Sequence, residues 1–446
     1  MDFRLAIGRS FIVPFLDTVS GKYLAPSDNV EGDMTSRERL VTSLHHQEPD
    51  RIPVDFGAMG STGITALAYA RLREHLGMKD GSIRVYDTGQ QLAEPEKPIL
   101  ELLGVDVLDL KRSLPPAYPD ARGWKPWKLR DGTDVEIPES FNPIPDPDGG
   151  YVIKDSAGRV VSRMPKDGFY FDGVYHPLEE MKSASEVREL DWESMKVSDR
   201  AVEDLRKRAE YLEKGTDYGI LFMGMGGVHE WGQGMRGWRN WIVDITGRRQ
   251  IAGALLERMM EVNMDRVKKM VRALSEHVQV MGFGDDLGMQ LGPQMSPATY
   301  RDMLKPCHEE MFTYVKRHSK CFTFLHSCGS IYSLLGDLVD AGLDAINPVQ
   351  ISAADMEPRR LKDEFGDQLT FWGGGADTQN VLGFKPVDAV RAHVAENVRI
   401  FSRGGGFVFN QVHNVQPNVS PESLLAAYET AKNVGRYASP ERIARA

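Results

Sequence analysis

The feature that most constrains the fold of this 446-residue chain is a repeated alternation of short apolar strands with amphipathic helices. Each strand candidate is rich in β-branched or aromatic residues and is stopped by Gly, Asp, Asn or Pro. The eight candidates lie near residues 51–56, 104–110, 218–223, 279–285, 321–326, 343–347, 369–373 and 406–410. Such alternation gives a parallel sheet, and eight strands predict an α/β protein closed into a (β/α)8 TIM barrel.

Helix-start signals support this pattern at both ends of the chain. Thr35 and Glu38 have the spacing of a capping box and predict a helix from Arg37 to His45. Ser296 followed by proline predicts the start of a single helix that extends from Met295 to His318.

Two regions lack the alternation of strands and helices, and they suggest where the domain boundaries lie. Residues 1–33 precede the first helix and are interpreted as an N-terminal appendage to a barrel domain of residues 34–446. Residues 112–176 are rich in Pro, Gly and Asp, and contain hairpin-like strands at 150–153 and 159–161. We therefore expect a small antiparallel insertion that covers one barrel mouth and acts partly as a substrate lid.

Charge and cysteine content narrow the classes of partner. The net charge is −10, from 54 Lys and Arg against 64 Asp and Glu, with no basic runs, which disfavours nucleic acid or an anionic membrane as main partner. Three cysteines do not make a disulfide framework, and the apolar stretches are shorter than a membrane span. The N-terminus also lacks the pattern of a secretion signal. These features predict a cytoplasmic protein.

The segment 321–330 carries the clearest chemical signal. Alternate residues of an extended strand point to the same face, so His326 and Cys328 project together at the strand's C-terminal end. Barrel enzymes keep their chemistry at this end, and imidazole and thiolate are preferred zinc ligands. The pair alone is also compatible with a buried thiol beside a hydrogen-bonded histidine.

Other predicted strands end in further donor side chains. Asp285 and Asp286 close one strand, and His413 follows the last. Three ligands, His326, Cys328 and His413, would hold a catalytic zinc ion and leave a fourth position free. Asp285 or Asp286 is an alternative third ligand or a partner of a ligand imidazole. We therefore assign Asp285, Asp286 and His413 as catalytic candidates.

These motifs together resemble the uroporphyrinogen decarboxylase (URO-D) superfamily, from about residue 35 to the C-terminus. The resemblance rests on residues 35–40, 51–54, 285–288, 326–329, 347–350 and 413–417. On this basis Asn347, Gln350 and Gly374 are assigned to cofactor binding. The resemblance also implies a homodimer.

The superfamily has two chemical branches. Its true decarboxylases bind tetrapyrrole carboxylates without metal, through an N-terminal segment resembling RQAGRY, whereas the corresponding region here, residues 55–60, contains no arginine. Zinc-dependent, corrinoid-linked methyltransferases carry an HxC pair and a later cysteine. His326 and Cys328 match that pair, and His413 occupies the third position. The histidine implies a substrate other than the thiol of coenzyme M methyltransferases.

The resemblance predicts a zinc enzyme that transfers a methyl group between a small substrate and a corrinoid. Two histidines and nearby carboxylates favour a methyl ether or methoxy compound, hence O-demethylation, over a thiol. The chain has no DxHxxG cobalamin-binding segment, so a partner corrinoid protein would supply the corrinoid. Two alternatives stay open, a URO-D-like lyase and a non-catalytic barrel that binds a tetrapyrrole or corrinoid.

A glycine-rich segment has no place in this hypothesis. Residues 224–227, Gly-Met-Gly-Gly, resemble a phosphate-binding loop only faintly. They lack the lysine and the spacing of that loop.

Overall fold

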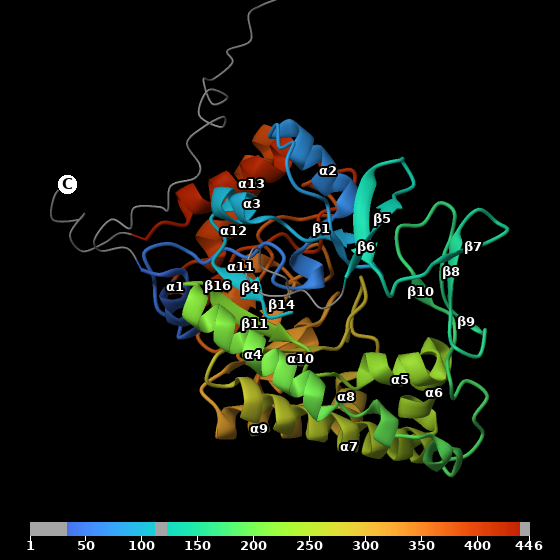
Figure 1. Ribbon diagram of the computed structural model, residues 1–446. Coiled ribbons are helices and arrows are strands. Elements are labelled where there is room, and N and C mark those ends of the chain that lie inside the picture. Colours follow the sequence, from blue (N-terminus) through green and yellow to red (C-terminus); the bar gives the residue numbers. More distant parts are fainter. Residues whose placement is uncertain (1–33, 112–122, 438–446) are drawn as a thin grey trace, which may run out of the picture.

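The computed structural model describes residues 34–111 and 123–437, and its centre is a curled parallel sheet surrounded by helices (Figure 1). The predicted appendage, residues 1–33, and the start of the predicted insertion, residues 112–122, lie outside the described residues. Seven strands form the sheet in the order β16-β15-β14-β13-β12-β11-β4. Their bounds are β4 Val107–Asp109, β11 Gly219–Met223, β12 Val280–Gly284, β13 Phe322–His326, β14 Ala345–Asn347, β15 Thr370–Trp372 and β16 Phe407–Val408.

The segment Pro53–Asp55 occupies the eighth position and closes the barrel. It exchanges backbone hydrogen bonds with Phe409 just after β16, over 2.8 and 2.9 Å, and the Val54 carbonyl accepts from Asp106 just before β4. The Val54 N–H donates instead to the Asp106 carboxylate, at 2.8 Å. The Asp106 carboxylate thus takes the place of a backbone carbonyl as the acceptor of the Val54 N–H. The predicted strand near 51–56 therefore forms isolated bridges only. The predicted α/β (β/α)8 barrel is confirmed.

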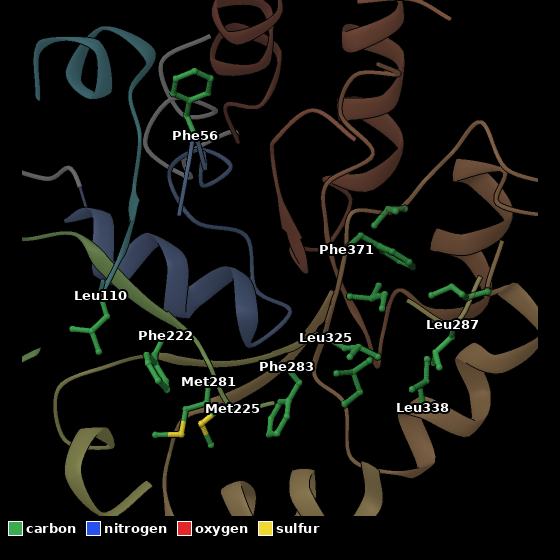
Figure 2. Packing of buried hydrophobic residues seen from close by; sticks show 14 of the residues in the cluster. Phe56, Leu110, Phe222, Met225, Met281, Phe283, Leu287, Leu325, Leu338 and Phe371 are labelled. Carbon is green, nitrogen blue, oxygen red and sulfur yellow. The ribbon is translucent and has the colours of Figure 1, made fainter. Parts of the chain in front are cut away.

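Alternation along the strands produces an inner and an outer core. Leu221, Val280, Phe324 and Trp372 belong to a cluster inside the barrel. Their neighbours in sequence face the helices instead, and Figure 2 shows Phe222, Met281, Phe283 and Leu325 together on this outer side. Residues on both faces are therefore apolar, as expected for a parallel sheet buried on both sides.

Thirteen α-helices lie among the described residues. Figure 1 shows α4, α7 and α9 along the lower side of the barrel. The bounds are α1 Ser36–Leu44, α2 Ala66–His75, α3 Lys97–Leu103, α4 Asp199–Gly215, α5 His229–Arg236, α6 Trp238–Gly247, α7 Arg249–Leu274, α8 Pro297–Met303, α9 Lys305–His318, α10 Tyr332–Asp340, α11 Pro358–Phe365, α12 Val387–Phe401 and α13 Pro421–Val434. None of the described helices combines the length and apolar character needed to span a membrane.

The single helix predicted from Met295 to His318 is wrong, because two helices form. Ser296 caps α8 as predicted, accepting the Thr299 N–H at 3.1 Å. The chain then breaks at Leu304 and restarts as α9, with Pro306 in its first turn. Proline has no N–H for the preceding turn and fits best at a helix start, so Pro306 favours two helices over one.

Helix α1 closes the N-terminal end of the barrel. Thr35 and Glu38 form the predicted capping box, with both reciprocal hydrogen bonds present. Leu40 and Leu44 of α1 are buried in the inner core cluster. The cap therefore fixes the start of the helix that fills this end of the barrel.

Replacing Thr35 by alanine is expected to lower the free energy of unfolding by about 1 kcal/mol, because it leaves the Glu38 N–H without its acceptor. Thr42→Ala, in the last turn of α1 and away from the N-terminal cap, is the control, since alanine is the better helix former there. Urea denaturation followed by circular dichroism measures both. Equal losses in the two variants would contradict the role of the cap.

Antiparallel strands lie outside the barrel and project to one side in Figure 1. They form a three-stranded sheet, a pair and a four-stranded sheet. The predicted hairpin is present as β8 paired with β9. The bounds are β1 Ile64–Thr65, β2 Val85–Asp87, β3 Leu92–Ala93, β5 Trp124–Lys128, β6 Asp134–Pro138, β7 Ile144–Pro145, β8 Tyr151–Lys154, β9 Val160–Met164 and β10 Asp172–Gly173.

Candidate metal centre

Three potential metal ligands meet at the C-terminal end of the barrel strands. One ligand atom from each of His326, Cys328 and His413 lies within 4.8 Å of the others. His326 is the last residue of β13, Cys328 follows two residues later, and His413 lies in the loop after β16. The Cys328 Sγ lies 3.4 Å from the His326 Nε2. The structure thus brings together all three residues that the sequence predicts as zinc ligands.

The amide of Asn347 fixes which nitrogen of His326 faces the cluster. The Asn347 Nδ2 donates to the Trp372 carbonyl at 2.8 Å, so its Oδ1 faces the His326 Nδ1 at 2.7 Å. An oxygen at this position requires the proton on Nδ1, which leaves the lone pair of Nε2 directed to the cluster. A hydrogen-bond acceptor behind a ligand imidazole fixes the orientation of the ring.

Replacing Asn347 by alanine is expected to weaken zinc binding by about 10- to 100-fold, because the His326 ring loses the acceptor that sets its tautomer. Ser61→Ala is the control, since the Ser61 Oγ also donates to the Asn347 Oδ1, at 3.0 Å, but does not touch the ring. Competition for zinc with a chromophoric chelator measures both affinities. Similar affinities for Asn347→Ala and wild type would contradict this role.

The protonation states within the cluster suit a cation. Burial raises the pKa of the Cys328 thiol well above its ordinary value, and the Asp286 carboxylate raises it further. Burial also lowers the pKa of His413, and the neighbouring His326 adds to this effect. A neutral imidazole can bind a metal directly, whereas a buried thiolate needs a nearby positive charge. The donor set therefore fits a zinc ion.

The paired carboxylates separate into two environments. Asp286 lies beside the cluster, where its Oδ1 accepts the Cys328 N–H at 2.7 Å and lies 3.7 Å from the His326 Nε2. Asp285 is buried beneath α5 and accepts the N–H groups of Val228 and Glu230, each at 2.8 Å. Asp286 thus holds the ligand loop, whereas Asp285 holds the start of α5.

The buried Asp285 also contacts a histidine that sequence reasoning missed. The His308 Nε2 lies 2.9 Å from the Asp285 Oδ2, and its Nδ1 lies 2.9 Å from the Tyr300 hydroxyl. All three residues are buried. These contacts occupy the Asp285 oxygens within the fold, which weighs against direct contact with a substrate.

The predicted cofactor-binding residues also take part in the fold. The Gln350 Oε1 accepts the Gly329 N–H at 2.8 Å and so fixes the turn after Cys328. Gly374 is buried, with a positive φ of 70°, and its N–H donates to the Pro348 carbonyl at 2.9 Å. Gln350 therefore supports the ligand loop, and Gly374 supports the loop between β15 and α12.

Glu230 is a further acidic group of this region that the sequence assignment left out. Its side chain reaches solvent, yet surrounding protein partly desolvates it. This burial, with the carboxylates of Asp286 and Asp285, raises the pKa of Glu230 to about 8. The raised pKa favours the protonated form of the Glu230 carboxyl at neutral pH. Its position after β11, the strand next to the one that ends at the paired carboxylates, was the available sequence signal.

A cavity of about 550 Å³ lies at the ends of β11 and β12, and β12 is the neighbour of β13, which ends at His326. Met223 of β11 and Gly284 of β12 line it. Gly284 pairs in register with His326 on the neighbouring strand, and a side chain on Gly284 would approach the Glu230 carboxylate. This volume suits a small organic ligand.

The antiparallel part contacts the loop that carries His413. The Tyr170 hydroxyl, which lies between β9 and β10, accepts from the Gln416 Nε2 at 2.6 Å and lies 3.3 Å from the Asn414 Oδ1. These contacts place part of the predicted insertion over the strand ends that hold the cluster.

Comparisons with known proteins agree with this architecture. The chain is similar in structure to a methyltransferase from Methanosarcina mazei, with a TM-score of 0.52 and 17% identity, over 90% of this chain and 99% of that one. A B12-independent methionine synthase from Shewanella sp. W3-18-1 has a TM-score of 0.33 and 13% identity, over 75% and 84% of the two chains, which is too distant to support an argument. No curated protein matches the chain in sequence.

The match to a protein family covers the segment that carries most of the candidate site. Residues 230–434 match the family uroporphyrinogen decarboxylase (URO-D). This range includes Glu230, Asp286, His326, Cys328 and His413. The resemblance inferred from the sequence motifs is thereby confirmed over residues 230–434, the part of the chain that matches this family.

Proposed function

We propose that the protein is a zinc-dependent methyltransferase that moves a methyl group between a small substrate and a corrinoid. The observation that carries this proposal is the cluster of His326, Cys328 and His413 at the catalytic end of the barrel. Three ligands of this type leave one coordination position for substrate, as in catalytic rather than structural zinc sites. The methyltransferase-like fold is consistent with this reaction.

Each residue around the cluster has a defined task in this mechanism. His326, Cys328 and His413 would hold zinc, which supplies Lewis acidity to a bound substrate oxygen or sulfur. Asn347 orients the His326 ring, and Asp286 holds the backbone of Cys328. The ligands are thereby fixed before substrate binds, which lowers the reorganisation needed during the reaction.

Glu230 supplies a proton donor on the cavity side of the site. When the bond between the methyl carbon and an ether oxygen breaks, the oxygen departs with the electron pair and requires a proton. The Glu230 carboxyl, with its pKa raised to about 8, holds such a proton at neutral pH. This role favours a methyl ether or methoxy compound over a thiol as the substrate.

Replacing Glu230 by glutamine is expected to lower the demethylation rate by about 100-fold near pH 7, because the proton donor is lost. In wild type the rate should fall as pH rises through about 8, where Glu230 loses its proton, or at lower pH if a bound cation lowers this pKa. The pH–rate profiles of both proteins measure this. If the pH–rate profile of Glu230→Gln has the same shape and the same maximum rate as that of wild type, Glu230 is not the proton donor.

The test of the proposed function is methyl transfer to free cob(I)alamin. Purified protein, expressed with added zinc, is mixed with cob(I)alamin and methanol, methoxybenzene or 4-methoxybenzoate, and methylcobalamin formation is followed by absorbance. We expect transfer from at least one methoxy compound, with zinc required. In the cell a separate corrinoid protein would dock at the barrel mouth. Decarboxylation of uroporphyrinogen without methyl transfer would replace this proposal with the lyase alternative.

A further inference from the structure

The cavity beside the cluster has a polar wall that the proposed mechanism does not use. Arg266 and Asn263 of α7 line it, together with Gly226 and Gly227 of the loop after β11. Met195, Met223 and Trp231 provide its apolar side. The cavity thus combines a cation, amide groups and an apolar surface.

Arg266 reaches the cavity without an acceptor among the described residues. Its side chain is half-buried, and the structure gives it no hydrogen bond or ion pair with any of them. The Nη1 lies 3.1 Å from the position that a Cβ on Gly226 would take, so the guanidinium lies against the loop. Burial lowers the pKa of Arg266, and Asp265 offsets this only in part. Because an unpaired, partly desolvated cation is costly, this arrangement favours an anionic ligand.

The glycine loop adds further donors to the same wall. Within the described parts of the chain, the N–H groups of Gly226 and Gly227 have no acceptor. Gly226 has a φ of 103°, and side chains at the two positions would collide with Asn263 and with the Gly284 carbonyl. Glycine is thus required for the loop to lie this close to α7 and β12.

Asn263 ties this loop to α7. Its Nδ2 donates to the Gly227 carbonyl at 2.8 Å, which holds the loop against the helix. The residue is fully buried, and its Oδ1 has no partner. The wall therefore keeps its shape without ligand while retaining an unused polar atom.

We propose that this cavity is a carboxylate subsite and that the methyl donor is a methoxylated aromatic carboxylate. Arg266 and the N–H groups of Gly226 and Gly227 receive the carboxylate, while Met223 and Trp231 contact the ring. Gly284 lines the cavity and adjoins His326, so a ligand held here can present its methoxy group to the cluster. The inference rests on the proposed function and adds the class of substrate.

The surrounding charges favour a carboxylate over a phosphate. Arg266 is the one cation of this cavity wall among the described residues. Asp285 lies against the same loop, where it accepts the Val228 N–H, and both Asp285 and Asp286 act electrostatically on Glu230. One guanidinium balances a monoanion, whereas a phosphate dianion would leave negative charge beside these carboxylates. Planar carboxylates also suit the guanidinium fork.

The test measures binding by isothermal titration calorimetry on the full chain, with 4-methoxybenzoate, its uncharged methyl ester and inorganic phosphate. The variants are Arg266→Met, which removes the charge, and Arg266→Lys, which keeps it but loses the fork. Arg272→Met is the matched control, since Arg272 is exposed near the end of the same helix. Circular dichroism verifies that each variant is folded.

We expect 4-methoxybenzoate to bind wild type and Arg272→Met alike, and Arg266→Met about 10- to 100-fold more weakly, with Arg266→Lys between them. The methyl ester should bind all four proteins equally weakly. No binding of 4-methoxybenzoate in the millimolar range, equal binding to Arg266→Met, or tighter binding of phosphate would each overturn the subsite.

Cys328→Ala separates this inference from the proposed function. The subsite does not include Cys328, so this variant should still bind 4-methoxybenzoate through Arg266 while losing zinc and methyl transfer. Carboxylate binding without methyl transfer in wild type would preserve the subsite and overturn the proposed function. If wild type transfers the methyl group and Arg266→Met leaves the rate unchanged, the proposed function would stand and the subsite would be overturned.

Discussion

Replacing Cys328 by alanine is expected to lower the affinity for zinc by more than about 100-fold and to abolish methyl transfer. The change removes the sulfur ligand and leaves the imidazoles of His326 and His413. Loss of a residue that only hydrogen-bonds to a metal ligand lowers metal affinity by about 10- to 100-fold. Loss of a direct ligand should therefore lower it further. Elemental analysis after dialysis against a chelator measures the zinc content, and the cob(I)alamin assay measures the rate.

The matched control for this prediction is Cys321→Ala. Cys321 precedes the start of β13, at the other end of the barrel, and its Sγ donates to the Val278 carbonyl at 3.2 Å. This variant removes a buried thiol from the same strand region but should keep its zinc and its activity. Zinc retained in Cys328→Ala after dialysis would contradict the ligand assignment, and zinc lost from both variants would show damage to the fold instead.

Replacing Asp285 by alanine is expected to lower the free energy of unfolding by about 3–5 kcal/mol, because it removes a buried carboxylate and leaves its partners unsatisfied in the interior. The variant leaves the N–H groups of Val228 and Glu230, and the His308 ring, without their acceptor. Urea denaturation followed by circular dichroism measures the change. A loss of activity with full stability would instead restore the predicted catalytic role of Asp285.

Asp286→Ala is the control, because Asp286 accepts one backbone N–H, from Cys328, and remains partly exposed. Asp286→Ala should lower the free energy of unfolding by about 0.5–1.5 kcal/mol, the net contribution of one hydrogen bond. The zinc affinity should fall, since the ligand loop loses its anchor. A larger stability loss for Asp286→Ala than for Asp285→Ala would contradict the roles that the hydrogen bonds give these residues.

The pH dependence of Asp285 has a defined sign. Burial by itself would raise its pKa, but the contacts with His308 and His229 outweigh burial and hold the pKa below the ordinary 3.8. A carboxyl with a lowered pKa stabilises the fold fully above its unfolded value, and this contribution is lost as the pH falls through the folded pKa. The stability difference between wild type and Asp285→Ala should therefore shrink only below about pH 4.

Most of the barrel and its ligand cluster could be predicted because they follow local rules. Strand periodicity places His326 and Cys328 on one face, and the closing of a parallel sheet brings the loop of His413 to the same end. The same periodicity separates neighbours, so Asp285 and Asp286 cannot both face the cluster. Which of them does is set by the register of β12 against β13, in which Gly284 pairs with His326.

The remaining features depend on contacts between distant segments. Arg266 lies in the middle of a long amphipathic helix, where no sequence pattern separates it from the exposed Arg272. Only the packing of α7 against the loop after β11 shows that Arg266 faces a cavity. The role of Asn347 likewise rests on the Trp372 carbonyl of the next strand, which sets its amide orientation.

X-ray absorption at the zinc edge, on protein purified after zinc-supplemented expression, tests whether His326, Cys328 and His413 hold a zinc ion. We expect about one zinc per chain, bound by one sulfur at about 2.3 Å and two imidazole nitrogens at about 2.0–2.1 Å, with a lighter atom in the fourth position. A bound zinc without a sulfur neighbour, or protein that contains no zinc, would contradict this assignment.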